Sequence, residues 1–306
     1  MSARYVVHHE TEYRYDSVVS VSHQALHLTP HTLPHQRCHG HRLRIEPAPT
    51  HQVNELDGFG NPLTRLEIDT PHRELLVAAE MDIEVDTRDA APDLDDSPSW
   101  EDAVAALAYR GGHVPTAAAL DANRYRFESP YVRWDADVAQ FARADFAPGT
   151  PLLRACARLM QRIHREFRFD AGATQVATPV AEVLENRHGV CQDFAHLMIA
   201  CLRSLGLAAR YVSGYLLTTP PPGQPRLIGA DASHAWVSVH CPHHGWIDFD
   251  PTNDMRPGDS HITLAWGRDF GDVSPLRGII LGGGAHELDV RVTVVPVVER
   301  TAEKLS

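Results

Sequence analysis

A cysteine at the start of a predicted amphipathic helix is the side chain in this sequence best placed to act as a nucleophile. The stretch 187–206 reads R-H-G-V-C-Q-D-F-A-H-L-M-I-A-C-L-R-S-L-G. Its apolar residues recur at helical spacing, and the helix is expected to stop near Gly206. Gly189 is expected to let the chain turn tightly just before it. Cys191 should therefore lie in the first turn, where backbone N–H groups and the helix dipole favour a thiolate, the form of cysteine that attacks carbonyls.

A base for this thiol, and a group to orient that base, are expected on two strands further along the chain. S-H-A-W-V-S-V-H at 233–240 alternates as a strand that opens with His234. G-W-I-D-F-D at 245–250 reads as a returning strand that ends at Asp250, before a proline. Because an antiparallel pair brings the start of one strand beside the end of the other, we expect this imidazole and this carboxylate to meet. Cysteine, histidine and aspartate in this order suit nucleophilic catalysis.

Other side chains compete for these roles. Asp248 lies two residues before Asp250 on the same strand face, and Asp254 lies past the turn. Asp193 suits the first turn of the helix as a partner for its dipole. His196, five residues on from the cysteine, projects about 140° around the helix from it. Neither of the two helical residues is our first choice as a partner for the thiol.

Three more residues are candidates for substrate binding or for holding an oxyanion. Gln192 could contact an oxyanion or a substrate amide, although the backbone N–H of Cys191 is fixed in place and is the better donor. Trp236 and Trp246 flank the proposed histidine and aspartate and could wall a substrate groove. Aromatic residues on strands equally often pack in a core, so both interpretations are kept.

Three ordered blocks, G-V-C-Q-D-F-A-H-L, S-H-A-W-V-S-V and G-W-I-D-F-D-P-T-N, resemble the catalytic blocks of the transglutaminase-like superfamily. This resemblance spans about residues 150 to 265. The opening R-Y-V-V-H-H-E-T-E-Y-R-Y-D is similar to the β-rich region that precedes such domains in bacteria. The resemblance implies a papain-like fold with Cys191 as nucleophile, His234 as general base and acid, and Asp250 as the residue that orients the imidazole. The D-P-T match favours Asp250 over its rivals.

The resemblance also implies the type of reaction, which is acyl transfer from a peptide or glutamine amide through a thioester. Water would resolve the thioester in a peptidase or amidase, and an amine would resolve it in a transglutaminase. The sequence does not choose between them, because the choice depends on water exclusion and on the acceptor groove. A non-catalytic peptide-binding or scaffold module with the same fold is the alternative, and an intact Cys, His and Asp argues against it.

No metal or cofactor is expected. The chain has twenty histidines, but those at 8–9, at 35–41 and at 241–244 lack the ligand spacing of zinc sites. The sequence contains no phosphate-binding G-x-x-x-x-G-K loop and no acidic loop with calcium-ligand spacing. Cofactor independence is the simplest prediction.

The order of elements predicts an α+β fold, with an N-terminal antiparallel β-sandwich ahead of a papain-like or transglutaminase-like core. In that core a catalytic helix would pack on an antiparallel sheet. The alternation of residues 5–15 and of 81–86 favours strands in the first unit. The expected division is a β-rich domain at 1–87, an acidic linker at 88–99, a helical connecting region at 100–149, the catalytic core at 150–268, and a C-terminal strand and tail at 269–306.

Within this division, three local expectations concern the later elements. Apolar spacing predicts a long helix from Leu152 to Phe167. Thr178 before Pro179 suggests an N-cap with proline at the first helical position, opening a short helix through Glu185. Residues 287–298 alternate as a strand, and the sequence does not show which sheet it joins.

Composition limits the partners. A net charge of −12 over 306 residues argues against nucleic acid or an anionic membrane as a partner. No apolar run approaches the length of a membrane span. Five cysteines without a dense framework, and no apolar leader at the N-terminus, predict a cytoplasmic protein. The expected partner is a peptide or protein substrate, and the oligomeric state is left open.

Overall fold

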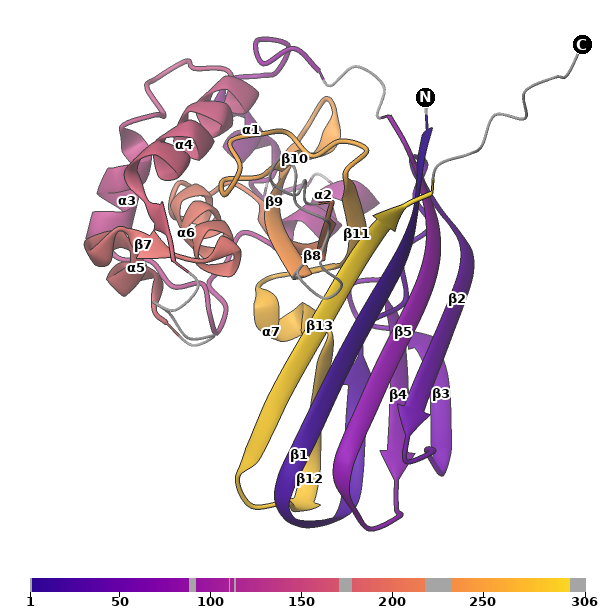
Figure 1. Ribbon diagram of the computed structural model, residues 1–306. Coiled ribbons are helices and arrows are strands. Elements are labelled where there is room, and N and C mark those ends of the chain that lie inside the picture. The colour runs from indigo at the N-terminus through magenta and orange to yellow at the C-terminus, as the bar shows by residue number, and fades with distance from the viewer. Residues whose placement is uncertain are drawn as a thin grey trace, which may run out of the picture.

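The computed structural model has the mixed α+β architecture that the sequence predicts. It describes residues 2–87, 92–109, 111–112, 114–170, 178–217 and 233–297. One part of the molecule consists of helices around a four-stranded antiparallel sheet, and the other is a long seven-stranded sheet that extends away from it (Figure 1). The predicted fold class is confirmed.

The seven-stranded sheet is built mainly from the N-terminal part of the chain. Its strands follow the order β2-β5-β1-β4-β3, and two C-terminal strands also pair with β1. Every pairing is antiparallel. The N-terminal strands are β1 (Ser2–Leu26), β2 (Gln36–Glu46), β3 (His51–Leu56), β4 (Pro62–Ile68) and β5 (His72–Asp86).

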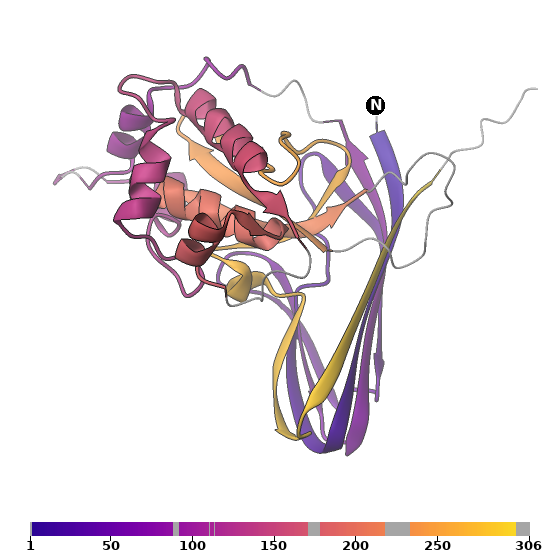
Figure 2. The same cartoon turned by 60° about the vertical axis from the view of Figure 1, so that its left-hand side comes forward.

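The long strand β1 joins two layers of this sheet. Its first part pairs with β5, and the pairing shifts register between Arg14 and Val19. From Val19 onward it pairs instead with β12, and from Ser22 with β4 as well. Irregular pairing of this kind bends a strand, so the sheet curls and its two halves face each other (Figure 2). Apolar side chains of both halves share one core, among them Val7, Leu26, Leu66, Ile68, Met81 and Ile83.

The two C-terminal strands complete this sheet. β12 (Leu276–Gly282) and β13 (His286–Pro296) both pair with β1, so the last strands of the chain lie along the first (Figure 1). The strand expected at 287–298 therefore joins the N-terminal sheet. Its final residue lies outside the described residues, as do residues 88–91 of the expected linker.

The connecting region expected at 100–149 is helical in separate pieces. Its helices are α1 (Trp100–Ala106), α2 (Ala117–Asn123) and α3 (Ala136–Arg143). Each starts at a side chain that accepts a backbone N–H, supplied by Ser99, Thr116 and Asp135 respectively. Such caps satisfy donors that the first helical turn leaves without partners.

The helices of the core surround a small sheet with the order β10-β9-β8-β11. The long predicted helix is α4 (Leu152–Glu166). The short helix α5 (Val180–Asn186) begins one residue later than expected, because Pro179 has extended backbone and occupies the N-cap position in place of Thr178. The remaining elements are β6 (Arg168–Phe169), β7 (His188–Gly189), α6 (Cys191–Ser204), β8 (Ala209–Leu216), β9 (Ser233–Cys241), β10 (Gly245–Phe249), β11 (His261–Gly267) and α7 (Phe270–Val273).

Helix α6 is buried more completely than its apolar stripe predicts. Its residues from Asp193 to Arg203 are all buried. Strands β8 and β9 cover one side of the helix, and α3, α4 and α5 pack on the others. Burial of a leucine or isoleucine side chain contributes about 1.5–3 kcal/mol, so this packing fixes the helix firmly relative to the small sheet.

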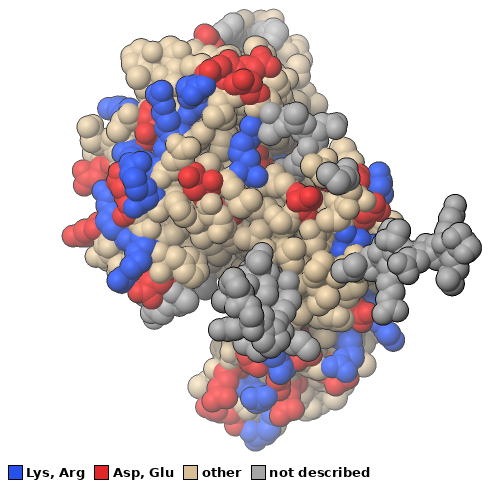
Figure 3. Space-filling model, turned by 45° about the horizontal axis from the view of Figure 1, so that its top comes forward, with Lys and Arg blue, Asp and Glu red and all other residues tan. Residues whose placement is uncertain are grey.

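The surface carries charges of both signs. On the face in Figure 3, Lys and Arg side chains are interspersed with Asp and Glu over the helical part of the molecule. Within the described ranges, no helix is both long enough and apolar enough to cross a membrane.

Candidate active site

Cys191 is the first residue of α6, and the chain just before it is held by the helix itself. Asp193 accepts a hydrogen bond of 2.8 Å from the backbone nitrogen of Val190, as expected for an acidic residue in a first turn. A Cβ at Gly189 would lie only 2.8 Å from Oδ2 of Asp193. The glycine therefore permits a close approach rather than the tight turn expected from the sequence. The left-handed residue before the helix is Arg187, with a φ of 57°.

The half-buried Cys191 side chain lies at the N-terminus of α6. The first N–H groups of a helix have no acceptor within it, and they carry the positive end of the helix dipole. An oxyanion that forms on a carbonyl attacked by the sulfur would face these donors.

His234 and Asp250 are in direct contact at the end of the β9-β10 hairpin. The imidazole Nε2 lies 2.7 Å from carboxylate Oδ2. Asp250 is fully buried and His234 is 8% exposed. Asp250 follows the last residue of β10, and its backbone pairs with Met255 across the next turn. The hairpin thus brings the two residues together as its alternation predicts.

Asp250 is surrounded by hydrogen-bond donors. Burial alone would raise the pKa of this carboxyl, but hydrogen bonds from His234, His261 and Asn253 hold it well below its usual range. Oδ1 accepts from the backbone nitrogens of Thr252 at 2.9 Å and Asn253 at 3.3 Å. Oδ2 accepts from the side-chain amide of Asn253 at 2.7 Å and from Nε2 of His261 at 3.2 Å. The carboxylate is therefore ionised and firmly oriented.

His234 lies between this carboxylate and the thiol. Burial disfavours the charged imidazole, but hydrogen bonds to Asp250 and Cys191, and the charges of both, raise the pKa of His234 to about 10. Because Nε2 contacts Asp250, the other ring nitrogen, Nδ1, is the one available to Cys191. At neutral pH the histidine is an imidazolium beside the sulfur. The imidazolium therefore has a proton to donate.

The competing residues of the sequence analysis lie elsewhere. Asp248 pairs with Ser238 within the β9-β10 ladder. Asp254 is exposed, with a φ of 50°. His196 is buried, and burial lowers its pKa to about 3, so its ring is neutral. Its Nε2 accepts the backbone N–H of Phe270 at 3.2 Å, which gives it a structural contact away from the hairpin end.

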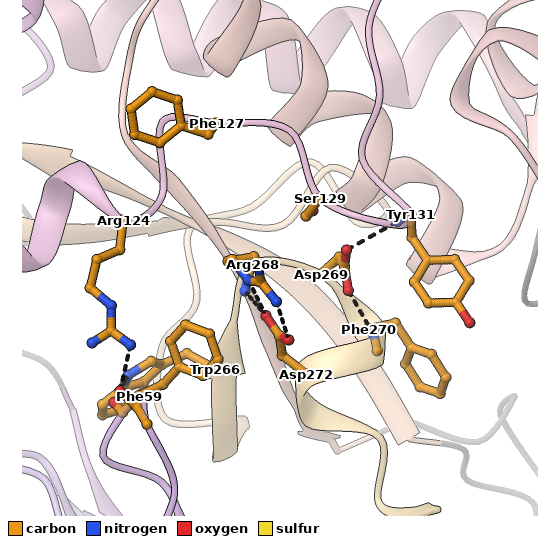
Figure 4. A network of polar contacts seen from close by, with 12 residues as sticks. Phe59, Arg124, Phe127, Ser129, Tyr131, Trp266, Arg268, Asp269, Phe270 and Asp272 are labelled. Carbon is orange, nitrogen blue, oxygen red and sulfur yellow. Dashed lines mark hydrogen bonds and ion pairs between the residues drawn. The ribbon is translucent and has the colours of Figure 1, made fainter.

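A network of polar contacts holds the far side of α6 and the strand that follows the hairpin (Figure 4). Asp269 accepts the backbone N–H of Tyr131 at 3.0 Å, and Arg268 binds Asp272 with two nitrogens at 2.8 and 2.9 Å. The buried Arg203 of α6 donates to the carbonyl oxygens of Phe127, Ala209 and Arg268 and to the hydroxyl of Ser129. These contacts tie α6 to β11 and α7.

The two tryptophans and the glutamine occupy three different environments. Trp236 is fully buried and packs edge-on against His261, with ring centroids 5.3 Å apart. Trp246 lies four residues before Asp250, roughly 13 Å along the strand, and packs against Tyr125 and Arg210. Gln192 is half-buried next to the cysteine. Trp236 thus supports the site from the core, and Trp246 lies away from it.

His261 and Asn253 are two contacts of the site that the sequence analysis did not identify. Asn253 lies in the quoted D-P-T-N block, which was a usable signal. His261 opens H-I-T-L-A-W-G, whose alternation is typical of a strand. Nothing local indicates that this strand returns to Asp250, because β8 separates β11 from β9 in the sheet.

Gly214 of β8 makes that return possible. A Cβ at this position would overlap the carbonyl oxygen of Ile262 and would lie 2.6 Å from Cη2 of Trp236. The bare backbone leaves room for the indole ring to reach His261 across β8. Glycine inside a strand often marks such a close approach.

In the described part of the chain, one group of three or more potential metal ligands lies close together, with its ligand atoms within 4.8 Å of one another. It consists of His234, Asp250 and His261. Ligands about 2.0–2.2 Å from a tetrahedral zinc ion would be separated by roughly 3.3 Å. The 2.7 Å between His234 and Asp250 is instead a charge-assisted hydrogen-bond length. The geometry fits a hydrogen-bonded chain better than a metal site.

Two family profiles match this chain. Residues 5–84 match the bacterial transglutaminase-like N-terminal region, and residues 139–251 match the transglutaminase-like superfamily. The second match contains the cysteine, the histidine and the aspartate described above. The chain belongs to the transglutaminase-like superfamily.

Similar proteins include relatives along the whole chain and along the core alone. An uncharacterised protein of Mycobacterium tuberculosis is 44% identical over 302 residues, which cover 96% of this chain and 93% of that protein. A protein-glutamine gamma-glutamyltransferase of Pseudomonas aeruginosa is 32% identical over 105 residues, or 33% of this chain and 16% of that protein. A candidate cysteine protease from Cytophaga hutchinsonii has the same fold, with a TM-score of 0.73 and 18% identity over 97% of this chain and 92% of its own.

Proposed function

We propose that this protein is a thiol enzyme that transfers acyl groups from peptide or glutamine amides by way of a thioester on Cys191. The observation that carries the proposal is the hydrogen-bonded chain from Asp250 through His234 to Cys191, with Asp250 and His234 2.7 Å apart. A raised histidine pKa next to a thiol at a helix N-terminus is the arrangement that nucleophilic catalysis by cysteine requires.

The first half of the reaction forms the thioester. The Cys191 sulfur attacks the amide carbonyl carbon, and the oxygen becomes an oxyanion close to the first N–H groups of α6. The His234 imidazolium donates its proton to the amide nitrogen as the carbon–nitrogen bond breaks, and the amine leaves. Asp250 holds the ring in one orientation throughout and stabilises its positive charge.

The second half of the reaction releases the acyl group. The neutral His234 removes a proton from water or from an amine, which attacks the thioester carbonyl and expels the Cys191 thiolate. Water gives a carboxylic acid, as in a peptidase or amidase, and an amine gives a new amide, as in a transglutaminase. The names of the two relatives above, a glutamyltransferase and a candidate protease, support acyl transfer from peptide groups in either form.

Mass spectrometry of a glutamine-containing peptide library tests the proposal. The wild-type protein and Cys191→Ala are incubated with the library, with and without a primary amine. Cys38→Ala is the matched control, because Cys38 is also half-buried but lies in β2. Amine adducts that require Cys191 would identify a transglutaminase, and cleaved or deamidated peptides would identify a hydrolase.

The same proteins separate the enzyme from a non-catalytic peptide-binding or scaffold module. We expect iodoacetamide to alkylate Cys191 near pH 6 far faster than Cys38, because the imidazolium stabilises the thiolate. Equal rates at the two cysteines, together with products that persist in Cys191→Ala, would reject the proposed nucleophile. A module without chemistry would show neither product nor selective alkylation.

A further inference from the structure

Asp250 is held from two directions. Its own turn supplies the amide of Asn253 and the backbone nitrogens of Thr252 and Asn253. His261 supplies a further donor from β11, with Nε2 3.2 Å from Oδ2. His261 is therefore the contact that connects the turn carrying the carboxylate to the far edge of the small sheet.

His261 has a defined hydrogen-bonding state. Its ring is fully buried, and its Nδ1 lies 3.3 Å from the hydroxyl of Ser260. An ionised carboxylate has no proton to give, so Nε2 carries the hydrogen and donates it to Asp250. The hydroxyl of Ser260 can then donate to Nδ1, so a neutral imidazole with its hydrogen on Nε2 satisfies both contacts.

The strand that carries His261 is held by the N-terminal sheet. β11 is an edge strand of the small sheet, and edge strands have unpaired backbone groups. The side-chain amide of Gln36 accepts from the nitrogen of Thr263 and donates to its oxygen, both at 2.8 Å. The side-chain amide of Asn61 likewise accepts from the backbone nitrogen of Trp266 at 2.9 Å and donates to its backbone oxygen at 2.8 Å. Both amides are buried and take the place of a further strand.

We propose that His261 is a positioning residue for the catalytic triad, and that the N-terminal sheet takes part in catalysis by holding β11 through Gln36 and Asn61. This proposal rests on the proposed function, because it concerns the orientation of the same Asp250. His261 touches neither substrate nor thiol in this scheme. Its neutral ring donates a hydrogen bond that keeps the carboxylate directed at His234.

The test compares His261→Gln with His261→Asn. The amide nitrogen of glutamine falls near the position of Nε2 and can still donate to Asp250. The asparagine side chain is shorter, so its amide nitrogen does not reach the carboxylate. His39→Gln and His39→Asn are the matched controls, because His39 of β2 also places Nε2 close to a carboxylate, 2.8 Å from that of Glu84, but lies partly exposed on the N-terminal sheet. Circular dichroism and thermal unfolding verify that each variant is folded.

The first readout is the rate of Cys191 alkylation by iodoacetamide from pH 5 to pH 10, which requires no substrate. The second readout is kcat and KM, each determined on a peptide substrate that the library experiment identifies. We expect His261→Asn to lower the alkylation rate near pH 6 and kcat by roughly tenfold to a hundredfold, with little change in KM, because a small displacement of a catalytic group costs this much. His261→Gln should stay within about threefold of wild type, and the His39 variants should match wild type in both readouts.

Two results would overturn the proposal. A wild-type pH profile and kcat in folded His261→Asn would show that the contact does not position Asp250, and equal losses in His261→Gln and His261→Asn would show that a neutral donor is not sufficient. Failure of the proposed function gives a different result, since wild-type Cys191 would then alkylate no faster than Cys38. That result would also reject the positioning role of His261.

Discussion

Gly214 of β8 lies directly opposite His234 of β9 in the antiparallel ladder. On its other side the same glycine pairs with Thr263 of β11. At this position the central strand therefore presents no side chain between the strand of His234 and the strand of His261. The two imidazole rings approach to 5.9 Å between centroids, so the site depends on a position where the fold needs the smallest residue.

Gly214→Ala should destabilise the protein and displace the histidines. An added methyl group would overlap the Ile262 carbonyl oxygen, and overpacking of this kind costs about 1–3 kcal/mol or more. Denaturant unfolding and Cys191 alkylation measure the two effects. Gly258→Ala is the control, because its added Cβ meets nothing within 4 Å. Equal behaviour of the two variants would show that the space at Gly214 is not limiting.

Asp250→Asn should reduce turnover by about a thousandfold or more, because an uncharged amide neither fixes the imidazole nor stabilises its positive charge. Asp248→Asn should stay within about twofold of wild type, since Asp248 pairs with Ser238. Steady-state kinetics on the same peptide checks both variants. A larger loss of turnover in Asp248→Asn than in Asp250→Asn would show that Asp248, and not Asp250, orients the imidazole.

The pH dependence of stability follows from the His234 pKa. The folded protein raises it from 6.5 to about 10, so the folded state retains a proton that the unfolded state loses. The stabilisation is complete below pH 6.5 and is lost as the pH rises toward 10. Asp250 contributes in the acid range instead. The folded protein lowers its pKa from the ordinary value of 3.8, so this stabilisation is complete above pH 3.8 and is lost as the pH falls below that value.

His234→Gln should remove the alkaline part of this dependence. Chemical denaturation at pH 6, 8 and 10 would show wild type losing more stability than the variant between pH 6 and pH 10. His243→Gln, at an exposed histidine, should follow wild type. Parallel curves for wild type and His234→Gln would contradict a raised histidine pKa.

Gln36→Leu should weaken the contact between the two sheets. It leaves the backbone nitrogen and oxygen of Thr263 buried without this partner, at a cost of about 1–3 kcal/mol for each group. Cys191 alkylation should slow as well if β11 positions the site. Gln52→Leu replaces an exposed glutamine of β3 and should change neither unfolding nor alkylation. Slower alkylation in Gln52→Leu would point to a general effect of the N-terminal sheet.

Much of the candidate site could be predicted from the sequence because its parts are local. Helical spacing after Cys191 indicates a helix that begins at that residue, and strand alternation on both sides of a short turn brings His234 and Asp250 together. These relationships depend on spacing within one helix and one hairpin. The family resemblance added roles to residues that the pattern had already placed.

The tertiary structure decided the features that join distant parts of the chain. Gln36 and Thr263 are 227 residues apart, and neither residue type indicates a partner in the other strand. The bend of β1, the return of β13 to that strand and the contact of His261 with Asp250 all depend on how whole elements pack. Short-range periodicity shows which face of an element is buried, whereas the choice of neighbour is made only when the apolar faces of distant segments meet.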